Sequence, residues 1–183
     1  QQKTASENQY SLSFDGENDY INLGDIGDIY PVTYELWFKP EYDILGSSNQ
    51  MYLIGKDGNG IYTFRIILGT NGQLGFGIGG AGTSGNWIWT SSNTWSSDQW
   101  YHVAGTVSET EMNLYVNGAI QGNLSMTDGV QSNGYNTYVG THVYANQDWF
   151  EGQIDEIRIW NRSLTASEII SNITRELTGN ENG

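Results

Sequence analysis

The sequence GQIDEIRIWNR occupies residues 152–162 and is followed by LTASEI at residues 164–169. Its β-branched isoleucines indicate a β-strand, yet Asp155 and Glu156 stand inside the run. Strands disfavour acidic residues, and a buried carboxylate needs a partner or a cation. We therefore expect this strand to supply a metal ligand or to keep one face in water.

Short apolar runs separated by turn residues fill the rest of the chain. Asn71-Gly72 and Asn117-Gly118 each stand between two such runs and predict hairpins, because both residue types tolerate positive φ. A helix is predicted at residues 165–173, with Ser163 or Thr165 as its N-cap. Strands are predicted at residues 10–14, 34–39, 51–55, 62–68, 74–78, 100–107, 112–116, 119–124 and 135–143. This pattern predicts an all-β fold, a two-sheet antiparallel β-sandwich or jelly roll with one short C-terminal helix.

The composition narrows the classes of partner. The 183 residues include 24 Gly, 2 Pro and 13% aromatics, which fits short strands joined by glycine turns. The net charge of −14 argues against nucleic acid and against anionic lipid surfaces, because both need clustered Lys and Arg. It favours divalent cations or neutral partners such as glycans. The chain has no Cys and therefore no disulfide framework.

The domain boundaries follow from the polar ends of the chain. We expect residues 1–9 to be a linker or a frayed N-terminus and residues 10–175 to form one sandwich domain. Residues 176–183 are expected to link this domain to a further domain of a larger protein. No apolar run approaches the length of about 20 residues that a membrane helix needs.

Five motifs resemble one known family. They are FDG at 14–16 with DYI at 19–21, YELWFKP at 34–40, QWYHVAGT at 99–106, LYVNG at 114–118, and the closing segment from 152 to 169. They resemble LamG-like jelly-roll domains of the concanavalin A-like lectin/glucanase superfamily, in the family's order and over most of residues 10–175. The resemblance implies the fold. It leaves the function open, because this fold hosts lectins, carbohydrate-binding modules, adhesion domains and enzymes.

The resemblance also implies a structural calcium ion between the opening and closing segments. Carried over to this chain, its ligands are Asp15, the main-chain oxygen of Gly16, Asp19 and Asp155. Oxygen ligands from acids and carbonyls are those that calcium prefers. The alternative is that Asp15 and Asp19 are turn acids and Asp155 a surface acid.

Tryptophans divide into two groups. Trp37, Trp100 and Trp160 stand in motif strands, where we expect them to be buried. Trp87, Trp89 and Trp95 lie among Gly, Ser, Thr and Asn, and the first two would share one face of a strand. Trp87 and Trp89 are candidate platforms for sugar rings, and the alternative is a hairpin edge folded back on the sandwich.

A second candidate sugar site precedes the closing strand. His142, Tyr144, Asn146, Asp148 and Trp149 mix donors, acceptors and aromatics, as a site for a neutral sugar requires. The alternative is an ordinary polar loop. An Asp-Gly pair at residues 57–58 adds an acid to such a rim or forms a plain turn.

Catalysis is not expected. Glycosidases of this fold use two carboxylates that flank one bond, whereas Asp155 and Glu156 are adjacent and would point to opposite faces. Glu109 and Glu111 have suitable spacing but stand at an expected hairpin tip. A polysaccharide lyase would combine His with Tyr and Arg, and His142 has no evident Arg partner in the sequence.

We therefore expect a non-catalytic carbohydrate-binding or lectin-like domain of a secreted or cell-surface multidomain protein, holding one structural calcium. Its expected partner is a poly- or oligosaccharide. The alternative is an adhesion domain that binds a protein, for which a flat patch would replace a concave cleft.

Overall fold

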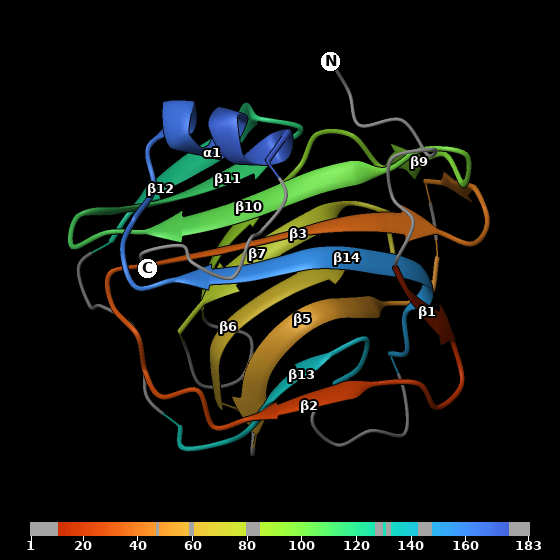
Figure 1. Cartoon of the computed structure of the whole chain (residues 1–183), viewed down its shortest axis with the longest axis horizontal. Helices are drawn as coiled ribbons and strands as arrows, with labels where there is room; N and C mark the ends of the chain where they lie inside the picture. Colours follow the sequence, from red (N-terminus) through yellow and green to blue (C-terminus); the bar gives the residue numbers. More distant parts are fainter. Residues whose placement is uncertain are drawn as a thin grey trace.

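A computed structural model describes residues 11–46, 48–58, 61–79, 85–126, 130, 133–142 and 148–175 of the chain. These residues form two large antiparallel β-sheets packed as a sandwich, with one short helix on the outside (Figure 1). The predicted all-β sandwich is confirmed. The expected linkers at residues 1–9 and 176–183 lie outside the described residues, so they stay a prediction.

The first sheet has the strand order β1-β14-β3-β10-β11-β12. Its strands are β1 (Leu12–Asp15), β3 (Val32–Pro40), β10 (Tyr101–Val107), β11 (Glu111–Val116), β12 (Ala119–Ser125) and β14 (Glu151–Trp160). The strands of its opening and closing segments, β1 and β14, pair side by side. The opening and closing motifs of the sequence therefore lie next to each other in the first sheet.

The second sheet has the order β2-β13-β5-β6-β7-β8. Its strands are β2 (Ile21–Gly24), β5 (Met51–Gly58), β6 (Ile61–Leu68), β7 (Leu74–Ile78), β8 (Asn86–Trp89) and β13 (Thr137–Val139). The short strands β4 (Ile44–Leu45) and β9 (Thr94–Trp95) form a separate pair. The hydrophobic core lies between the two large sheets, so each sheet also has an outer face that turns away from its partner.

Alternation along the strands decides which side chains fill the core. In β6, Phe64, Ile66 and Leu68 belong to the core, whereas Arg65 and Ile67 do not. The predicted strand at 135–143 is shorter than expected, since only Thr137–Val139 pair. Trp37, Trp100 and Trp160 are all buried, as predicted, with exposed fractions of 8% or less.

Turn and cap chemistry behave as the sequence predicts. Asn117 and Gly118 both have positive φ, 50° and 78°, and join β11 to β12. The helix α1 (Ala166–Ile173) begins after Thr165, whose side chain accepts from the Glu168 N–H while the Glu168 side chain accepts from the Thr165 N–H. This capping box satisfies two groups that a helix start otherwise leaves unpaired.

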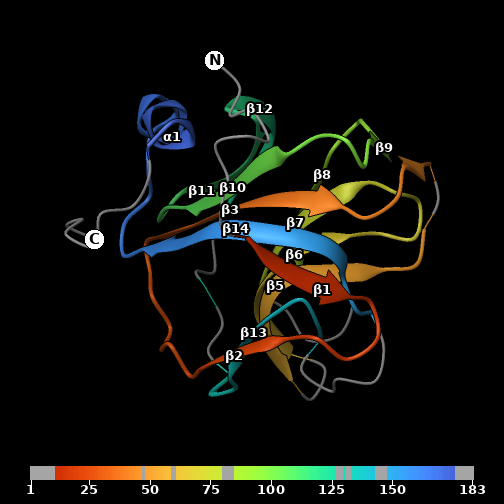
Figure 2. The same ribbon diagram turned by 45° about the vertical axis from the view of Figure 1, so that its right-hand side comes forward.

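Helix α1 lies against the outer face of the first sheet, as both views show (Figures 1 and 2). Its Ile169 packs with Ala104, Tyr115, Trp160 and Leu164 in a second, smaller cluster. Beneath the helix lies Glu35, whose Oε1 accepts from Trp160 Nε1 at 2.8 Å and from Asn172 Nδ2 at 3.0 Å. Helix α1 therefore occupies part of the outer face of the first sheet.

The two acids inside the closing strand lie at a β-bulge. The pairing of β14 with β3 shifts between Asp155 and Arg158, and Glu156 adopts a φ of 50°. The Glu156 carboxylate contacts Arg158 at 2.7 Å, and Asp155 Oδ1 accepts from the Glu156 N–H at 2.8 Å. The simple alternation that placed these two acids on opposite faces is wrong here, because the bulge interrupts it.

Within the part of the chain that the structure describes, no helix has the length and apolar character to cross a membrane.

Candidate functional site

The outer face of the second sheet carries one continuous row of cross-strand partners. The row runs through all six strands and consists of Asn22, Tyr138, Gly55, Arg65, Gly77 and Trp87. Directly paired residues share one face of a sheet. Because Arg65 points away from the core, the other five members of the row also lie on the outer face. This face is the candidate site.

Two indoles lie on glycines of the neighbouring strand. A Cβ built on Gly77 would lie 2.7–2.8 Å from three ring atoms of Trp87, and one built on Gly75 would lie 2.5–2.8 Å from the ring of Trp89. Only glycine leaves room for rings to lie this close to the sheet. The two indoles stack on each other with centroids 5.0 Å apart, and Trp89 is 38% exposed. Together they form an aromatic platform at the β8 edge.

A polar network lies in the middle of the face. Asp57 Oδ2 contacts Arg65 Nε at 2.7 Å and His142 Nε2 at 3.3 Å, and accepts a hydrogen bond from the Tyr52 hydroxyl at 3.2 Å. Arg65 also lies over the Tyr62 ring, 4.1 Å from its centroid. Asp57 is 1% exposed and belongs to strand β5, so the plain-turn alternative for it is wrong.

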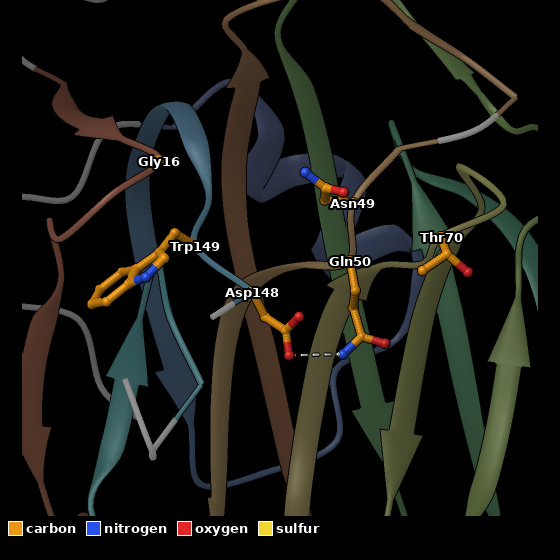
Figure 3. Close-up of a pocket in the computed structure, with 6 residues that line it drawn as sticks. All are labelled: Gly16, Asn49, Gln50, Thr70, Asp148 and Trp149. Carbon is orange, nitrogen blue, oxygen red and sulfur yellow. Dashed lines mark hydrogen bonds between the residues drawn. The ribbon is translucent and has the colours of Figure 1, made fainter. Parts of the chain in front are cut away.

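A pocket of about 450 Å³ opens beside this network (Figure 3). Its described lining consists of Gly16, Asn49, Gln50, Thr70, Asp148 and Trp149. Gln50 Nε2 donates to Asp148 Oδ2 at 3.2 Å. Figure 3 shows the indole of Trp149 on one side of this pair and the side chain of Thr70 on the other. The pocket thus combines an aromatic surface with amide, carboxylate and hydroxyl groups.

The backbone fixes Asp148 at the edge of the pocket. Its φ is 64°, in the left-handed region that Asp tolerates better than most residues, and its carbonyl accepts from the Tyr52 N–H at 3.0 Å. Burial raises the pKa of the Asp148 carboxyl above its ordinary value, and the Gln50 hydrogen bond and nearby His142 offset only part of this effect. The Asp148 carboxyl therefore lines the pocket while it accepts a hydrogen bond from Gln50.

Aromatic rings extend the site toward the β2 edge. Trp149 lies 6.1 Å from Tyr20, and Tyr20 lies 5.9 Å from Tyr138, measured between ring centroids. Tyr20 is half exposed. The outer face therefore carries aromatic side chains at both edges, with polar groups between them.

The structure brings most of the predicted sugar-site residues to this face and to the pocket beside it. Trp149 and Asp148 line the pocket, His142 joins the Asp57 network, and Trp87 and Trp89 form the platform. Tyr144 and Asn146 lie outside the described residues.

The sequence alone missed Arg65, Tyr52 and Gln50. Arg65 and Tyr52 come from strands whose apolar neighbours dominate the pattern, and Gln50 precedes β5. One sequence signal could have identified Arg65: it is the single arginine in an apolar strand, and it alternates with Phe64 and Ile66.

The predicted calcium ligands are only partly brought together. Asp15, Gly16 and Asp19 share one turn, in which Asp15 Oδ1 accepts from the N–H groups of Glu17 at 2.9 Å and Asn18 at 3.0 Å. These hydrogen bonds, from Asn18 foremost, lower the pKa of the exposed Asp15 carboxyl.

Asp155 is placed elsewhere. Because Leu12 pairs with Ile154 and Asp15 with Glu151, Asp155 follows the paired position of Leu12 and lies at the other end of β1 from Asp15. Among the described residues, no group of three or more His, Cys, Asp or Glu side chains is arranged to hold a metal ion. Carbonyl and carboxylate oxygens of Asp15, Gly16 and Asp19 fit calcium chemistry, but the four-residue set is not assembled. The calcium ion stays a prediction.

Comparison with known proteins gives the family. A family model described as the concanavalin A-like lectin/glucanases superfamily matches residues 15–170. The chain belongs to this superfamily. A search of curated protein sequences finds no significant match for this superfamily member.

Solved structures of the concanavalin A-like fold resemble it at low identity. The carbohydrate-binding module CBM40 of the Ruminococcus gnavus IT-sialidase, bound to α2,3-sialyllactose, has a TM-score of 0.71 at 16% identity, with 94% of this chain and 98% of that chain covered. Domain 4 of AbnA, an extracellular arabinanase from Geobacillus stearothermophilus, in complex with arabinotriose, has a TM-score of 0.68 at 20% identity, with coverages of 90% and 76%. A SAP-like pentraxin from Limulus polyphemus has a TM-score of 0.68 at 18% identity, with coverages of 90% and 81%. These likenesses establish the shared fold.

Proposed function

We propose that this domain binds a poly- or oligosaccharide, without catalysis, on the outer face of its second sheet. The observation that carries the proposal is the pocket in which the indole of Trp149 stands beside the hydrogen-bonded Asp148–Gln50 pair. Sugars present C–H faces and hydroxyl groups together. A binding site for them therefore needs flat apolar surfaces next to a few oriented polar groups.

The comparisons support this proposal. Two of the similar structures were solved with a saccharide, sialyllactose in one and arabinotriose in the other. Helix α1 packs on part of the outer face of the first sheet, whereas the second sheet presents the partly exposed indole of Trp89. The glycan is therefore assigned to the second sheet.

The polar network argues against lyase-type catalysis. His142, Tyr52 and Arg65 do come together, contrary to what the sequence indicated, and this is the combination that a polysaccharide lyase would use. However, Tyr52 is 1% exposed, its hydroxyl donates to Asp57, and burial raises its pKa well above the ordinary value. A buried phenol that holds its proton this firmly is unsuited to act as a base on a sugar.

We place the domain outside the cell, secreted or at the cell surface, as one part of a multidomain protein. The similar arabinanase domain comes from an extracellular enzyme, which supports this setting. An adhesion domain that binds a protein is the alternative. It predicts that no glycan binds and that the exposed aromatic residues contact a protein instead.

Changing Trp149 to Ala is expected to weaken glycan binding by about 1–3 kcal/mol, because one stacking surface of the pocket is lost. The measurement is retention of the pure domain in affinity gels that contain soluble polysaccharides, followed by titration calorimetry. Ile170→Ala is the control, since Ile170 is exposed on α1, which packs on the opposite sheet. Full affinity in the Trp149→Ala variant would place the site elsewhere, and no binding on a broad panel would favour the adhesion alternative.

Removing calcium with a chelator is expected to lower the melting temperature by several degrees. An ion that binds only the native state stabilises that state, and each kcal/mol corresponds to about 2–4 °C in a domain of this size. Asp15→Asn should abolish the difference between melting curves with calcium and with chelator. Identical melting curves for the unchanged protein with calcium and with chelator would contradict the calcium prediction.

A further inference from the structure

The pocket and the aromatic platform are neighbours. Thr70 lines the pocket, and the residue before it, Gly69, meets the Trp89 ring, which lies 3.0 Å from a Cβ built on that glycine. Trp149 lines the pocket from the opposite side. A ligand that extends from this pocket toward β8 therefore meets Trp149 at one end and Trp89 at the other.

Strand order separates the aromatic groups at the two edges of the second sheet. Trp149 contacts Tyr20, which in turn contacts Tyr138 on β13, whereas Trp89 lies over Gly75 on β7. Strand β13, which carries Tyr138, and strand β7, which carries Gly75, are separated by three steps of about 4.8 Å, which is roughly 14 Å. A single sugar ring is little wider than one strand spacing, so it does not span the aromatic groups at the two edges of the sheet.

Hydrogen-bonding groups fill the path between the two indoles. Gln50 precedes β5 and Thr70 follows β6, so both lie in the middle of the path. Asp148 bonds to Gln50 and lies between Gln50 and Trp149 in the view of Figure 3. Sugars held between the indoles would therefore meet an amide, a hydroxyl and a carboxylate.

The charges around this path are unfavourable for an acidic glycan. Asp148 is the one described lining residue whose side chain is ionisable. A second carboxylate side chain, that of Glu151, lies against Gly16 at the rim of the pocket. The nearby guanidinium of Arg65 is already paired with Asp57. Like charges at a contact oppose binding, so uronic or sialic acids are disfavoured here.

We propose that the ligand is a neutral glycan chain of at least three sugar residues, which lies across the ends of β5 and β6. One sugar stacks on Trp149, another stacks on Trp89, and the sugar between them meets Asp148, Gln50 and Thr70. This inference rests on the proposed function and adds the length and charge of the ligand. In this arrangement, Trp89 determines how binding affinity depends on the length of the glycan chain.

The test uses arabinan, xylan, β-glucan and mannan as neutral probes and polygalacturonate as the acidic probe. For the neutral polymer that binds best, calorimetry measures its oligosaccharides from the monosaccharide to the hexasaccharide. Affinity is expected to rise about ten-fold or more between the disaccharide and the tetrasaccharide, which is the gain from a second stacking contact. Oligogalacturonides of equal length should bind at least ten-fold more weakly at low salt.

Two variants test the two indoles separately. Trp89→Ala should remove the gain in affinity with chain length, whereas Trp149→Ala should weaken ligands of every length. Ile170→Ala on the far sheet should match the unchanged protein.

Each outcome decides a separate claim. Equal affinity for the monosaccharide and the tetrasaccharide, or tighter binding of the acidic series, would overturn this inference and leave the proposed function standing. Failure of every saccharide to bind, with the fold intact by circular dichroism, would overturn both.

Discussion

Replacing Glu35 with alanine is expected to lower the free energy of unfolding by about 3–5 kcal/mol, the usual cost of removing one partner of a buried charged group. The Glu35 side chain is fully buried. Its Oε1 accepts from Trp160 and Asn172, and its carboxylate lies 3.6 Å from Arg158 and 3.5 Å from His102. The alanine variant leaves these partners buried without their shared acceptor. Chemical denaturation followed by tryptophan fluorescence measures the change.

Two further variants control this experiment. Glu109→Ala removes an exposed glutamate and should change stability by no more than about 0.5 kcal/mol. Glu35→Gln keeps an acceptor for Trp160 and should cost less than the alanine variant. A loss below about 1 kcal/mol for Glu35→Ala would show that the network under α1 contributes little.

The same carboxylate predicts a dependence of stability on pH. Burial by itself would raise the pKa of Glu35, but the His102, Trp160 and Arg158 contacts outweigh it, and the pKa lies below the ordinary 4.5. A group whose pKa is lower in the folded state stabilises the fold above its unfolded pKa. This stabilisation is lost as the pH falls below about 4.5 and through the folded pKa. Glu35→Gln should therefore flatten that part of the stability curve, and an unchanged slope would contradict the assignment.

Replacing Lys56 with methionine is expected to cost about 3 kcal/mol, because its ammonium is the cation of a buried ion-pair cluster. Its Nζ donates to Asp25 Oδ1 at 2.7 Å, to Asp28 Oδ1 at 2.9 Å and to the Gly27 carbonyl at 2.9 Å. The Lys56 side chain has no exposed surface, whereas the two carboxylates are partly exposed and keep some hydration after the change. The expected loss therefore lies near the lower end for a buried pair.

Lys39→Met is the matched control for this substitution. Lys39 is partly exposed on β3, so the same chemical change there should alter stability by no more than about 0.5 kcal/mol. Thermal melts of both variants under one buffer condition make the comparison. Equal melting temperatures for Lys56→Met and Lys39→Met would show that the segment from 25 to 28 does not depend on the buried ammonium.

The local features of this protein can be predicted from its sequence. Alternating apolar residues identified most strands, Asn117-Gly118 identified a hairpin, and Thr165 with Glu168 identified the start of the helix. These features are readable because each depends on residues close together in the chain: side-chain periodicity, tolerance of positive φ, and a cap. The five family motifs then fixed how the strands assemble into a sandwich.

Individual side chains near the site were predictable in part. Trp149, Asp148 and Trp89 were predicted as candidates because aromatics and acids in a polar segment are unusual, and the structure places them at the pocket or the platform. Arg65 was not identified, because its strand otherwise reads as a core strand. The placement of Asp155 was also missed, since the bulge after it has no strong local signal.

Which residues share a surface depends on how the strands pair in the folded protein. Asn22, Tyr138, Gly55, Arg65, Gly77 and Trp87 are scattered over more than half of the chain, and the strand register aligns them in one row. That register is set by packing of the opposite, apolar face of the sheet, because a one-residue slip would turn Phe64 and Ile66 out of the core. The composition of the candidate site is therefore a consequence of core packing, which no local pattern in the sequence encodes.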